Sequence, residues 1–514
     1  MDRRTFLKSL SLSALVPWYV ASCAEDEGLE KYVWEGPLGP ETVFSHSVAS
    51  GDPLSNAAII WTRVSLESHA PVEVFFEVAR DEAFKDRVSA GYVGTSAYED
   101  HTVKIDVTGL APGKTYYYRF ACLGRYSPVG RTRTAAASGL KPVTFGVVSC
   151  SNYRRGYFHA YRALAEHDDL DCVLHLGDYI YENGGPGEIP TRDSDPPWEC
   201  LTLEDYRRRY AQHRADEDLQ LLHARHPMIA VWDDHETAND ASRDGAPSHS
   251  ASDGSWVIRK AAATRAYLEW MPIRETVAGR IFRGFSFGDV LDLHMLDTRL
   301  WARTKQVISA DLARSDEPDL LGPDQEAWLF ERFAQSTALW NVLGQQVMMA
   351  QLKLQGGLEA DGGGSFINFD QWDGYQQSRK RLYDAASAND SKLVVLTGDI
   401  HSSWANELTL DPNNPETFDP TTGRGAVGVE FVTPAVTSPG FDTLPPSILE
   451  RLLVENPQVR WVNATERGFM VVNFDSESIR TEFFHVEDIQ ATTGVVYSAA
   501  VFLTQRDDLV IRRQ

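Results

Sequence analysis

The sequence predicts a chain of two domains, an all-β sandwich followed by a larger α/β domain. Strand-length runs of alternating apolar and polar residues, separated by turn residues, occupy 43–134. Beyond them, short apolar strands end in acidic and other metal-ligand residues, a pattern typical of open α/β sheets. The length of 514 residues exceeds what one hydrophobic core supports, which also favours two domains.

The composition is that of a folded soluble protein. Hydrophobic residues make up 43% of the chain and charged residues 24%, which excludes disordered, collagen-like and coiled-coil chains. Because 73 acidic residues outnumber 49 basic ones, the net charge is −24, and we expect no nucleic-acid binding through a basic patch. Phosphate chemistry stays open, since a bound metal cluster inverts the local field. Five cysteines are too few for a disulfide scaffold, and the sequence does not decide whether Cys122, Cys172 and Cys200 form a bridge.

The first 22 residues are predicted to be an export signal. Arg3 and Arg4 precede Phe-Leu-Lys and a short apolar run over 9–21, which resembles a twin-arginine signal. The run is too short and too interrupted for a membrane span, and the alternative is a chance arginine pair in an ordinary signal. The signal predicts a periplasmic or extracellular protein.

Cys23 follows Val-Ala-Ser in a segment that resembles a bacterial lipobox. Cleavage before Cys23 would leave a lipidated N-terminus that attaches the protein to a membrane. The alternative is a cysteine beside a cleavage site of another kind. Residues 23–40 are then predicted to be a polar tether.

The all-β domain is predicted over 41–135. The runs 57–62, 72–78 and 102–107 have strand length and are apolar or alternate. A Pro-Gly turn then leads to Tyr116 at the start of the next strand, which resembles the tyrosine corner of fibronectin-type sandwiches. Because metal-ligand residues are sparse here, we expect this domain to be a spacer or a wall beside the active site.

The α/β domain is predicted over 136–514, and four of its strands end in metal-ligand residues. Since open α/β sheets bind ligands at the carboxyl ends of their strands, we expect these residues to meet. One such residue is usually structural, but four independent accidents in one domain are improbable. The residues are Cys150 after the run 143–148, Asp178 and Tyr181 after 172–176, Asp234 and His235 after 228–232, and Asp399 and His401 after 393–397.

The ligand types indicate which metals they suit. Asp178, Asp234 and Asp399 supply hard oxygen atoms, which suit divalent ions such as Ca²⁺. Tyr181 binds a metal well only as a phenolate, and its ordinary pKa of about 10 requires a strong Lewis acid beside it. Ferric iron therefore fits this group, with Cys150 as a thiolate ligand, better than Zn²⁺ or Mg²⁺.

These motifs together resemble those of the PhoD-type alkaline phosphatases, which are metallophosphoesterases similar to purple acid phosphatases. The matching segments are 149–153, 176–182, 232–236 and 397–402, with 46–53, 60–63 and 431–440 beside them. The resemblance implies a four-layer αββα sandwich behind an N-terminal fibronectin-like or Ig-like domain. It also implies Fe³⁺ and Ca²⁺ as cofactors, with Fe³⁺ held by Cys150, Asp178, Tyr181 and His401, and Ca²⁺ facing Asp178, Asp234 and Asp399.

The resemblance assigns further roles near this centre. His235 would donate a hydrogen bond or a proton near the leaving group, and Asp234 stands where related enzymes usually carry Asn. Gln345 is the nearest counterpart of a further histidine ligand. Asn152 and Arg154, just past Cys150, are candidate contacts to the metal or to the phosphate of the substrate.

The predicted function is that of a secreted or lipid-anchored monomeric alkaline phosphatase acting on phosphate monoesters and some diesters. A metal-bound hydroxide would attack phosphorus in line, without a covalent enzyme intermediate. One alternative is a phosphodiesterase or a phospholipase D-like enzyme on the same metal site. Others are a zinc hydrolase and a non-catalytic binding lipoprotein whose working part is the β-sandwich.

Overall fold

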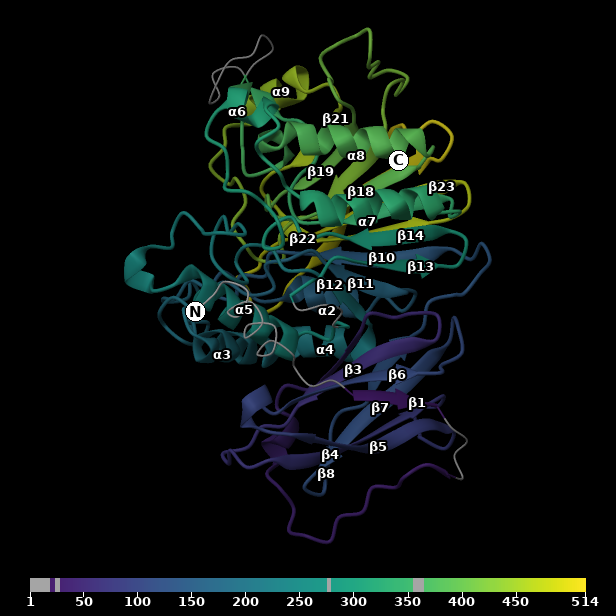
Figure 1. Ribbon diagram of the computed structural model, residues 1–514, viewed down its shortest axis with the longest axis vertical. Coiled ribbons are helices and arrows are strands. Elements are labelled where there is room, and N and C mark those ends of the chain that lie inside the picture. Colours follow the sequence, from purple (N-terminus) through teal and green to yellow (C-terminus); the bar gives the residue numbers. More distant parts are fainter. Residues whose placement is uncertain (1–18, 24–27, 275–278, 355–364) are drawn as a thin grey trace.

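The computed structural model of the protein describes residues 19–23, 28–274, 279–354 and 365–514 (Figure 1). The predicted twin arginines, Arg3 and Arg4, lie outside these residues. The N-terminal part lies at one end of the molecule, and the α/β part stacks above it.

The N-terminal part is a β-sandwich, as predicted. One of its sheets has the order β5–β4–β7–β8, with β9 paired to β7, and the facing strands are β1, β6, β3 and β2. Apolar side chains from both sheets, such as Ile60 and Phe76, share one core. The strands are β1 (Tyr19–Ser22), β2 (Val48–Gly51), β3 (Ala57–Arg63), β4 (Val72–Ala79), β5 (Arg87–Thr95), β6 (Thr102–Thr108), β7 (Thr115–Cys122), β8 (Arg125–Tyr126) and β9 (Gly130–Arg133).

The predicted tyrosine corner is confirmed. The Tyr116 hydroxyl oxygen accepts a hydrogen bond from the Ala111 backbone N–H at 2.8 Å, and the Tyr116 ring is buried. This bond ties the turn before β7 to the strand itself.

Strand β1 was not expected, because the sequence analysis left residues 1–22 out of the fold. The structure places Tyr19–Ser22 beside β6 in a parallel pair, with Tyr19 opposite Ile105. An extended segment satisfies the backbone groups that the edge of β6 would otherwise leave open.

The two parts of the chain share one continuous sheet. Strand β2 pairs in parallel with β12 (Met228–Ala230), where Gly51 lies opposite Met228. A Cβ atom on Gly51 would lie 2.2 Å from the Pro272 carbonyl oxygen, so the close approach requires glycine. Next to it, the buried Asp52 accepts two hydrogen bonds from Arg283, at 2.6 and 2.8 Å. The β-sandwich therefore extends the sheet of the α/β part.

Two sheets form the centre of the α/β part. In the first, β12, β11 (Cys172–His175) and β10 (Val143–Val148) are parallel. Antiparallel strands continue this sheet: β22 (Arg467–Phe474), β23 (Ser478–Val486), β24 (Val496–Gln505) and β25 (Ile511–Arg513). The second sheet has the order β13 (Arg283–Phe287), β14 (Leu291–Met295), β15 (Trp340–Gly344), β18 (Leu393–Thr397), β20 (Gly428–Val432), β19 (Ser403–Leu408) and β21 (Val459–Asn463).

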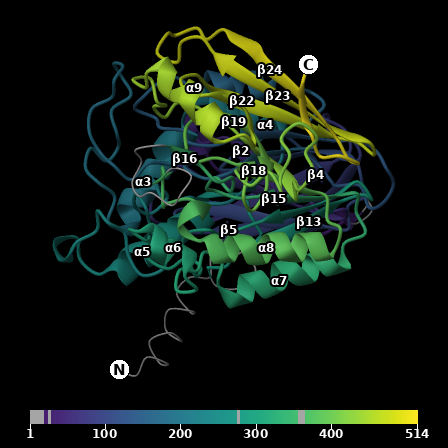
Figure 2. The same cartoon turned by 90° about the horizontal axis from the view of Figure 1, so that it is seen from above.

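Helices cover the outer faces of both sheets, which confirms the predicted αββα layers. Helices α2 (His159–Ala165) and α4 (Glu217–Arg225) contact the first sheet. Helices α7 (Gly322–Gln335) and α8 (Gln376–Ala388) lie side by side over the second (Figure 2). The other α-helices are α3 (Leu203–Arg214), α5 (Trp256–Trp270), α6 (Ala310–Arg314) and α9 (Pro446–Glu455).

Strand β18 shows how the sequence builds these layers. Successive side chains of a strand point to opposite faces. Val394 and Leu396 accordingly join the core between the sheets, whereas Leu393 and Val395 join the core beneath α7 and α8. A strand buried on both faces is apolar throughout, which is why its polar end stands out in the sequence.

Two further features concern membrane spans and cysteines. None of the described helices combines the length and the apolar character that a membrane crossing requires. All five cysteines lie within the described residues and are free, which answers the open question about Cys122, Cys172 and Cys200.

Candidate metal centre

The carboxyl ends of β10, β11, β12 and β18 bring the predicted ligands together. These residues form three sets, and within each set the potential ligand atoms lie within 4.8 Å of one another. The sets are Cys150, Asp178 and His401; Asp178, Asp234 and His235; and Asp233, Asp234 and Asp399. Asp178 and Asp234 each belong to two sets, so the sets form one continuous centre.

Cys150, Asp178, Tyr181 and His401 form what we call the mixed-ligand group. The Tyr181 hydroxyl donates a hydrogen bond to Asp178 Oδ2 at 2.9 Å and lies 3.2 Å from His401 Nε2. Tyr181 was predicted from its place three residues after Asp178, and the structure brings its oxygen among the other three ligands.

The segment 437–439 contacts two members of the mixed-ligand group, Tyr181 and His401. The Ser438 hydroxyl donates to the Tyr181 oxygen at 2.5 Å, and the Pro439 carbonyl oxygen lies 2.9 Å from His401 Nδ1. With Nδ1 protonated, His401 presents Nε2 to the centre, the arrangement that histidine ligands of metals need.

Asp233, Asp234 and Asp399 form what we call the carboxylate group. A buried guanidinium, that of Arg299, is hydrogen-bonded to Asp233 Oδ1 and, at 2.7 Å, to Asp399 Oδ1. Asp234 Oδ2 lies 3.8 Å from the same guanidinium. The carboxylate group is therefore held by ion pairs, whereas the mixed-ligand group is held by neutral hydrogen bonds.

Four of the predicted ligands have a left-handed backbone. The φ angles are 60° at Cys150, 55° at Asp178, 65° at Asp399 and 57° at His401. This conformation is unfavourable for residues other than glycine and persists only where the surroundings enforce it, most often at functional sites. The strain turns each side chain sharply off the end of its strand.

Gly177 makes one of these turns possible. Its φ angle is 107°, and a Cβ atom would lie 2.3 Å from the Asp233 Cβ atom. Only glycine therefore lets the loop after β11 pass so close to the loop after β12. Glu236 joins the same loops by accepting hydrogen bonds from the backbone N–H groups of Asp178, Tyr179 and Asp233.

His235 lies beside the centre and is held by Glu182. The distance from His235 Nδ1 to Glu182 Oε2 is 2.6 Å, and the His235 ring lies 4.2 Å from the Tyr181 ring between centroids. Burial lowers the pKa of His235, but Glu182, Asp234 and Asp178 outweigh it and hold that pKa well above its ordinary value. These three carboxylates favour the protonated form of His235.

The pKa values of Cys150 and Tyr181 are shifted in the opposite direction from the pKa of Asp234. Burial, reinforced by Asp178, raises the pKa values of Cys150 and Tyr181 well above their ordinary ranges. In the carboxylate group, burial would raise the pKa of Asp234, but Arg299 and His235 lower it below its usual range. Burial raises the pKa of Asp399 to about 7.

Of the three remaining predicted residues, two share a small cleft with Tyr181. Asn152, Arg154 and Tyr181 line that cleft. The Gln345 amide is engaged elsewhere: it donates to the Val347 carbonyl and Thr397 Oγ1, and it accepts from Trp372 Nε1. Among the described residues, the Gln345 side chain makes no hydrogen bond to the mixed-ligand group.

Asp233, Arg299 and Ser438 belong to the site but were not predicted from the sequence. Arg299 follows β14 by four residues, and β14 is parallel to β15 and belongs to the same sheet as β18. The rule that ligands gather at strand ends could therefore have found Arg299. Asp233 precedes Asp234 directly, and the sequence does not tell which of two neighbours points inward. Ser438 meets Tyr181 across 257 residues, and no local signal announces that contact.

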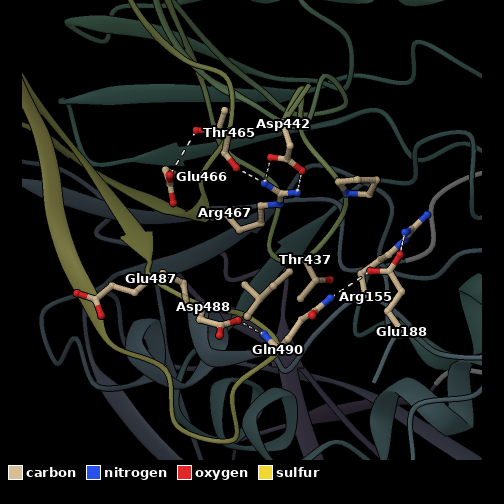
Figure 3. Close-up of a pocket in the computed structure, with 13 residues that line it drawn as sticks. Arg155, Glu188, Thr437, Asp442, Thr465, Glu466, Arg467, Glu487, Asp488 and Gln490 are labelled. Carbon is tan, nitrogen blue, oxygen red and sulfur yellow. Dashed lines mark hydrogen bonds and ion pairs between the residues drawn. The ribbon is translucent and has the colours of Figure 1, made fainter. Parts of the chain in front are cut away.

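A cavity of about 340 Å³ lies next to the segment 437–439, whose Thr437 and Pro439 line it (Figure 3). Arg467 and Arg155 face it, and each is paired with a carboxylate, Asp442 and Glu188 respectively. Arg467 Nε also donates to the Ser438 carbonyl oxygen at 3.0 Å. The other lining residues are Thr437, Pro439, Thr465, Glu466, Val486, Glu487, Asp488, Ile489 and Gln490.

Comparison with known proteins identifies the family. Residues 145–483 match the PhoD-like phosphatases, and residues 36–136 match their N-terminal domain. The chain is 35% identical over 497 residues to alkaline phosphatase D of Bacillus subtilis (strain 168). The alignment covers 91% of this chain and 82% of that protein. A solved structure described as the structure of PhoD superposes with a TM-score of 0.84 at 33% identity and covers 93% of both chains. The chain is therefore a PhoD-like phosphatase, a hydrolase of phosphoric esters.

Proposed function

We propose that this phosphatase hydrolyses phosphate monoesters at a cation cluster divided between its two ligand groups. The observation that carries the proposal is the meeting of Cys150, Asp178, Tyr181 and His401 with Asp234 and Asp399 in one buried centre. A donor set that includes a thiol, a phenol, an imidazole and several carboxylates has no use in phosphate binding, where anions would repel the substrate. Cations explain all of its members at once.

The residues present fit Fe³⁺ in the mixed-ligand group and Ca²⁺ in the carboxylate group. Cys150 and Tyr181 are buried with raised pKa values, so a strong Lewis acid is needed to hold them as anions. Asp233 Oδ2 and Asp234 Oδ1 are buried without a hydrogen-bond partner among the described residues, and carboxylate oxygens suit a hard divalent ion. When bound, such cations would neutralise charge on the ester and lower the pKa of a water nucleophile.

His235 would assist the departing alcohol. Its pKa is held high by Glu182 and two aspartates, so it carries the proton that the leaving oxygen needs. Glu182 fixes the ring through Nδ1, which leaves Nε2 to face the substrate. Arg154, at the cleft beside Tyr181, is the cationic group that would orient the phosphate.

The test compares Tyr181→Phe with Tyr179→Phe in hydrolysis of p-nitrophenyl phosphate at alkaline pH with Ca²⁺ present. We expect the wild type to show a violet absorption band from tyrosinate bound to ferric iron, and Tyr181→Phe to lose both band and activity. Tyr179, whose hydroxyl is paired with His223, is the matched control. A Tyr181→Phe variant that keeps its metals, its colour and full activity would contradict the site assignment.

A phosphodiester is the second candidate substrate, and the cavity next to the segment 437–439 favours it. That cavity lies against the segment whose Ser438 and Pro439 contact Tyr181 and His401, and it would provide room for a second organic substituent on phosphorus. Turnover of bis(p-nitrophenyl) phosphate without turnover of the monoester would identify a phosphodiesterase. Turnover of neither ester by metal-loaded protein would contradict both proposals.

The location and state of the mature protein are also proposals. The twin-arginine motif and the lipobox at Cys23 support export followed by lipid attachment, and cleavage there would remove β1 from the mature sheet. We expect the intact mass of the exported protein to show an acylated N-terminus at residue 23, and Cys23→Ser to lose it. A mature chain that begins elsewhere or is unmodified would contradict the anchor, and light scattering would test the expected monomer.

A further inference from the structure

The carboxylate group, which would bind a divalent cation, already contains a positive charge, the guanidinium of Arg299. Its side chain is fully buried, and its donor atoms reach Asp233 through Nε, Asp399 through Nη2 at 2.7 Å and Asp370 through Nη1 at 2.7 Å. With Asp234 at 3.8 Å, four carboxylates surround one guanidinium. Since burying that many unpaired charges would be prohibitively costly, the guanidinium is a structural part of this side of the centre.

The hydrogen bonds of Arg299 leave a defined set of oxygen atoms free. The Asp233 side chain accepts from Arg299 through Oδ1, while its Oδ2 is buried without a hydrogen-bond partner among the described residues. Asp234 Oδ2 accepts from the Asp240 N–H at 2.6 Å, and its Oδ1 is likewise without a partner among the described residues. Arg299 thus takes one oxygen of Asp233 and leaves the other to bind something else.

The position of Arg299 is itself fixed. Its backbone N–H donates to Asp297 Oδ1 at 2.9 Å, and its neighbour Thr298 is bonded to Gln346. Asp370, which binds Nη1, also pairs with the buried Arg303. A planar guanidinium held at both ends orients several carboxylates at once, which the single ammonium of lysine cannot do.

We propose that Arg299 is a positioning residue that prepares the carboxylate group for its divalent cation. It offsets part of the charge of four carboxylates, and it turns Asp233 and Asp399 so that their free oxygens face the cation. Net negative charge remains for a divalent ion, and because Arg299 is buried it touches neither substrate nor solvent. The inference rests on the proposed function, since it presupposes a cation in this group.

The experiment measures Ca²⁺ binding by equilibrium dialysis and iron content by mass spectrometry and the violet band, for wild type, Arg299→Lys and Arg303→Lys. We expect Arg299→Lys to bind Ca²⁺ about 10- to 100-fold more weakly, as for other residues that orient metal ligands, while its iron band stays. Arg303 is equally buried but reaches the carboxylate group only through Asp370, so Arg303→Lys should lose far less Ca²⁺ affinity than Arg299→Lys.

A second variant tests the inference without replacing Arg299, in case Arg299→Lys fails to fold. Asp370→Asn keeps Arg299 but loosens its Nη1 contact, and we expect a smaller loss of Ca²⁺ affinity in the same direction. Unchanged or tighter Ca²⁺ binding by Arg299→Lys would overturn the inference, because Arg299 would then be a bystander or a competitor of the cation. Loss of the iron band and of the folded circular dichroism spectrum together with Ca²⁺ would overturn it as well, by making Arg299 a residue of the whole fold. Wild-type protein that binds neither metal would refute the proposed function itself.

Discussion

The two halves of the centre are built from different chemistry, although they share one edge of the fold. The mixed-ligand group is stabilised by uncharged contacts: Ser438 to Tyr181, and the Pro439 carbonyl to His401. The carboxylate group is stabilised by the buried Arg299. Raised pKa values keep Cys150 and Tyr181 neutral without a metal, whereas Asp234 is an anion beside the fixed positive charge of Arg299.

Because of this difference, cation binding should release protons from some ligands and none from others. Cys150 and Tyr181 must each release a proton to become ligands, because their raised pKa values keep them neutral without a metal. Asp234 is already ionised, because Arg299 and His235 lower its pKa against the effect of burial. Cation binding should therefore release protons from Cys150 and Tyr181 but none from Asp234.

Asp178→Asn should have the largest effect, because Asp178 belongs to two of the three ligand sets. We expect both metal contents to fall and kcat/KM for p-nitrophenyl phosphate to drop on the order of a thousandfold or more. Asp169→Asn, an exposed site on the loop before β11, serves as the control. An Asp178→Asn variant with both metals at full occupancy would show that the halves do not share this residue.

His235→Ala should separate chemistry from metal binding. We expect kcat to fall about 10²- to 10⁴-fold with both metals retained, because the proton donor to the leaving alcohol is lost. The loss should be larger for an alkyl phosphate than for p-nitrophenyl phosphate, whose leaving group needs no proton. Equal losses for the two esters would contradict the assigned role, and Glu182→Gln should give a weaker version of the same pattern.

Ser438→Ala should act on one half alone. Removing the hydroxyl that donates to Tyr181 should weaken iron binding by about 10- to 100-fold, the usual cost of losing a group that orients a ligand. Ca²⁺ affinity, measured on the same variant, is the internal control and should not change. Parallel losses of both metals would mean that the two halves are not independent.

Asp442→Asn should have the smallest effect. Asp442 pairs with Arg467 at 2.7 Å on the rim of the cavity, and its side chain is 51% exposed. An exposed ion pair contributes about 1 kcal/mol or less, so we expect a change in KM of about fivefold at most, reduced further by salt. A hundredfold loss would show that the pair, through Arg467 and the Ser438 carbonyl, controls the mixed-ligand group.

Sequence reasoning found most ligands because their strands are unambiguous. The runs that become β10, β11 and β18 are mostly apolar, so Cys150, Asp178 and Asp399 stand out beyond their ends. The same reasoning passed over Arg299, since it looked for metal ligands and a cation is not one. Gln345 was included because it follows β15, but its amide is used to join β15 to β18 and Trp372.

By itself the sequence determined the class of each domain, the strands and the side chains that end them, because these depend on local periodicity. Only the tertiary structure decided how those side chains face one another. The left-handed backbone at Cys150, Asp178, Asp399 and His401 is imposed by packing and opposed by local preference. Arg299 and Ser438 reach their partners across 66 and 257 residues, and contacts of that separation exist only once both sheets have assembled.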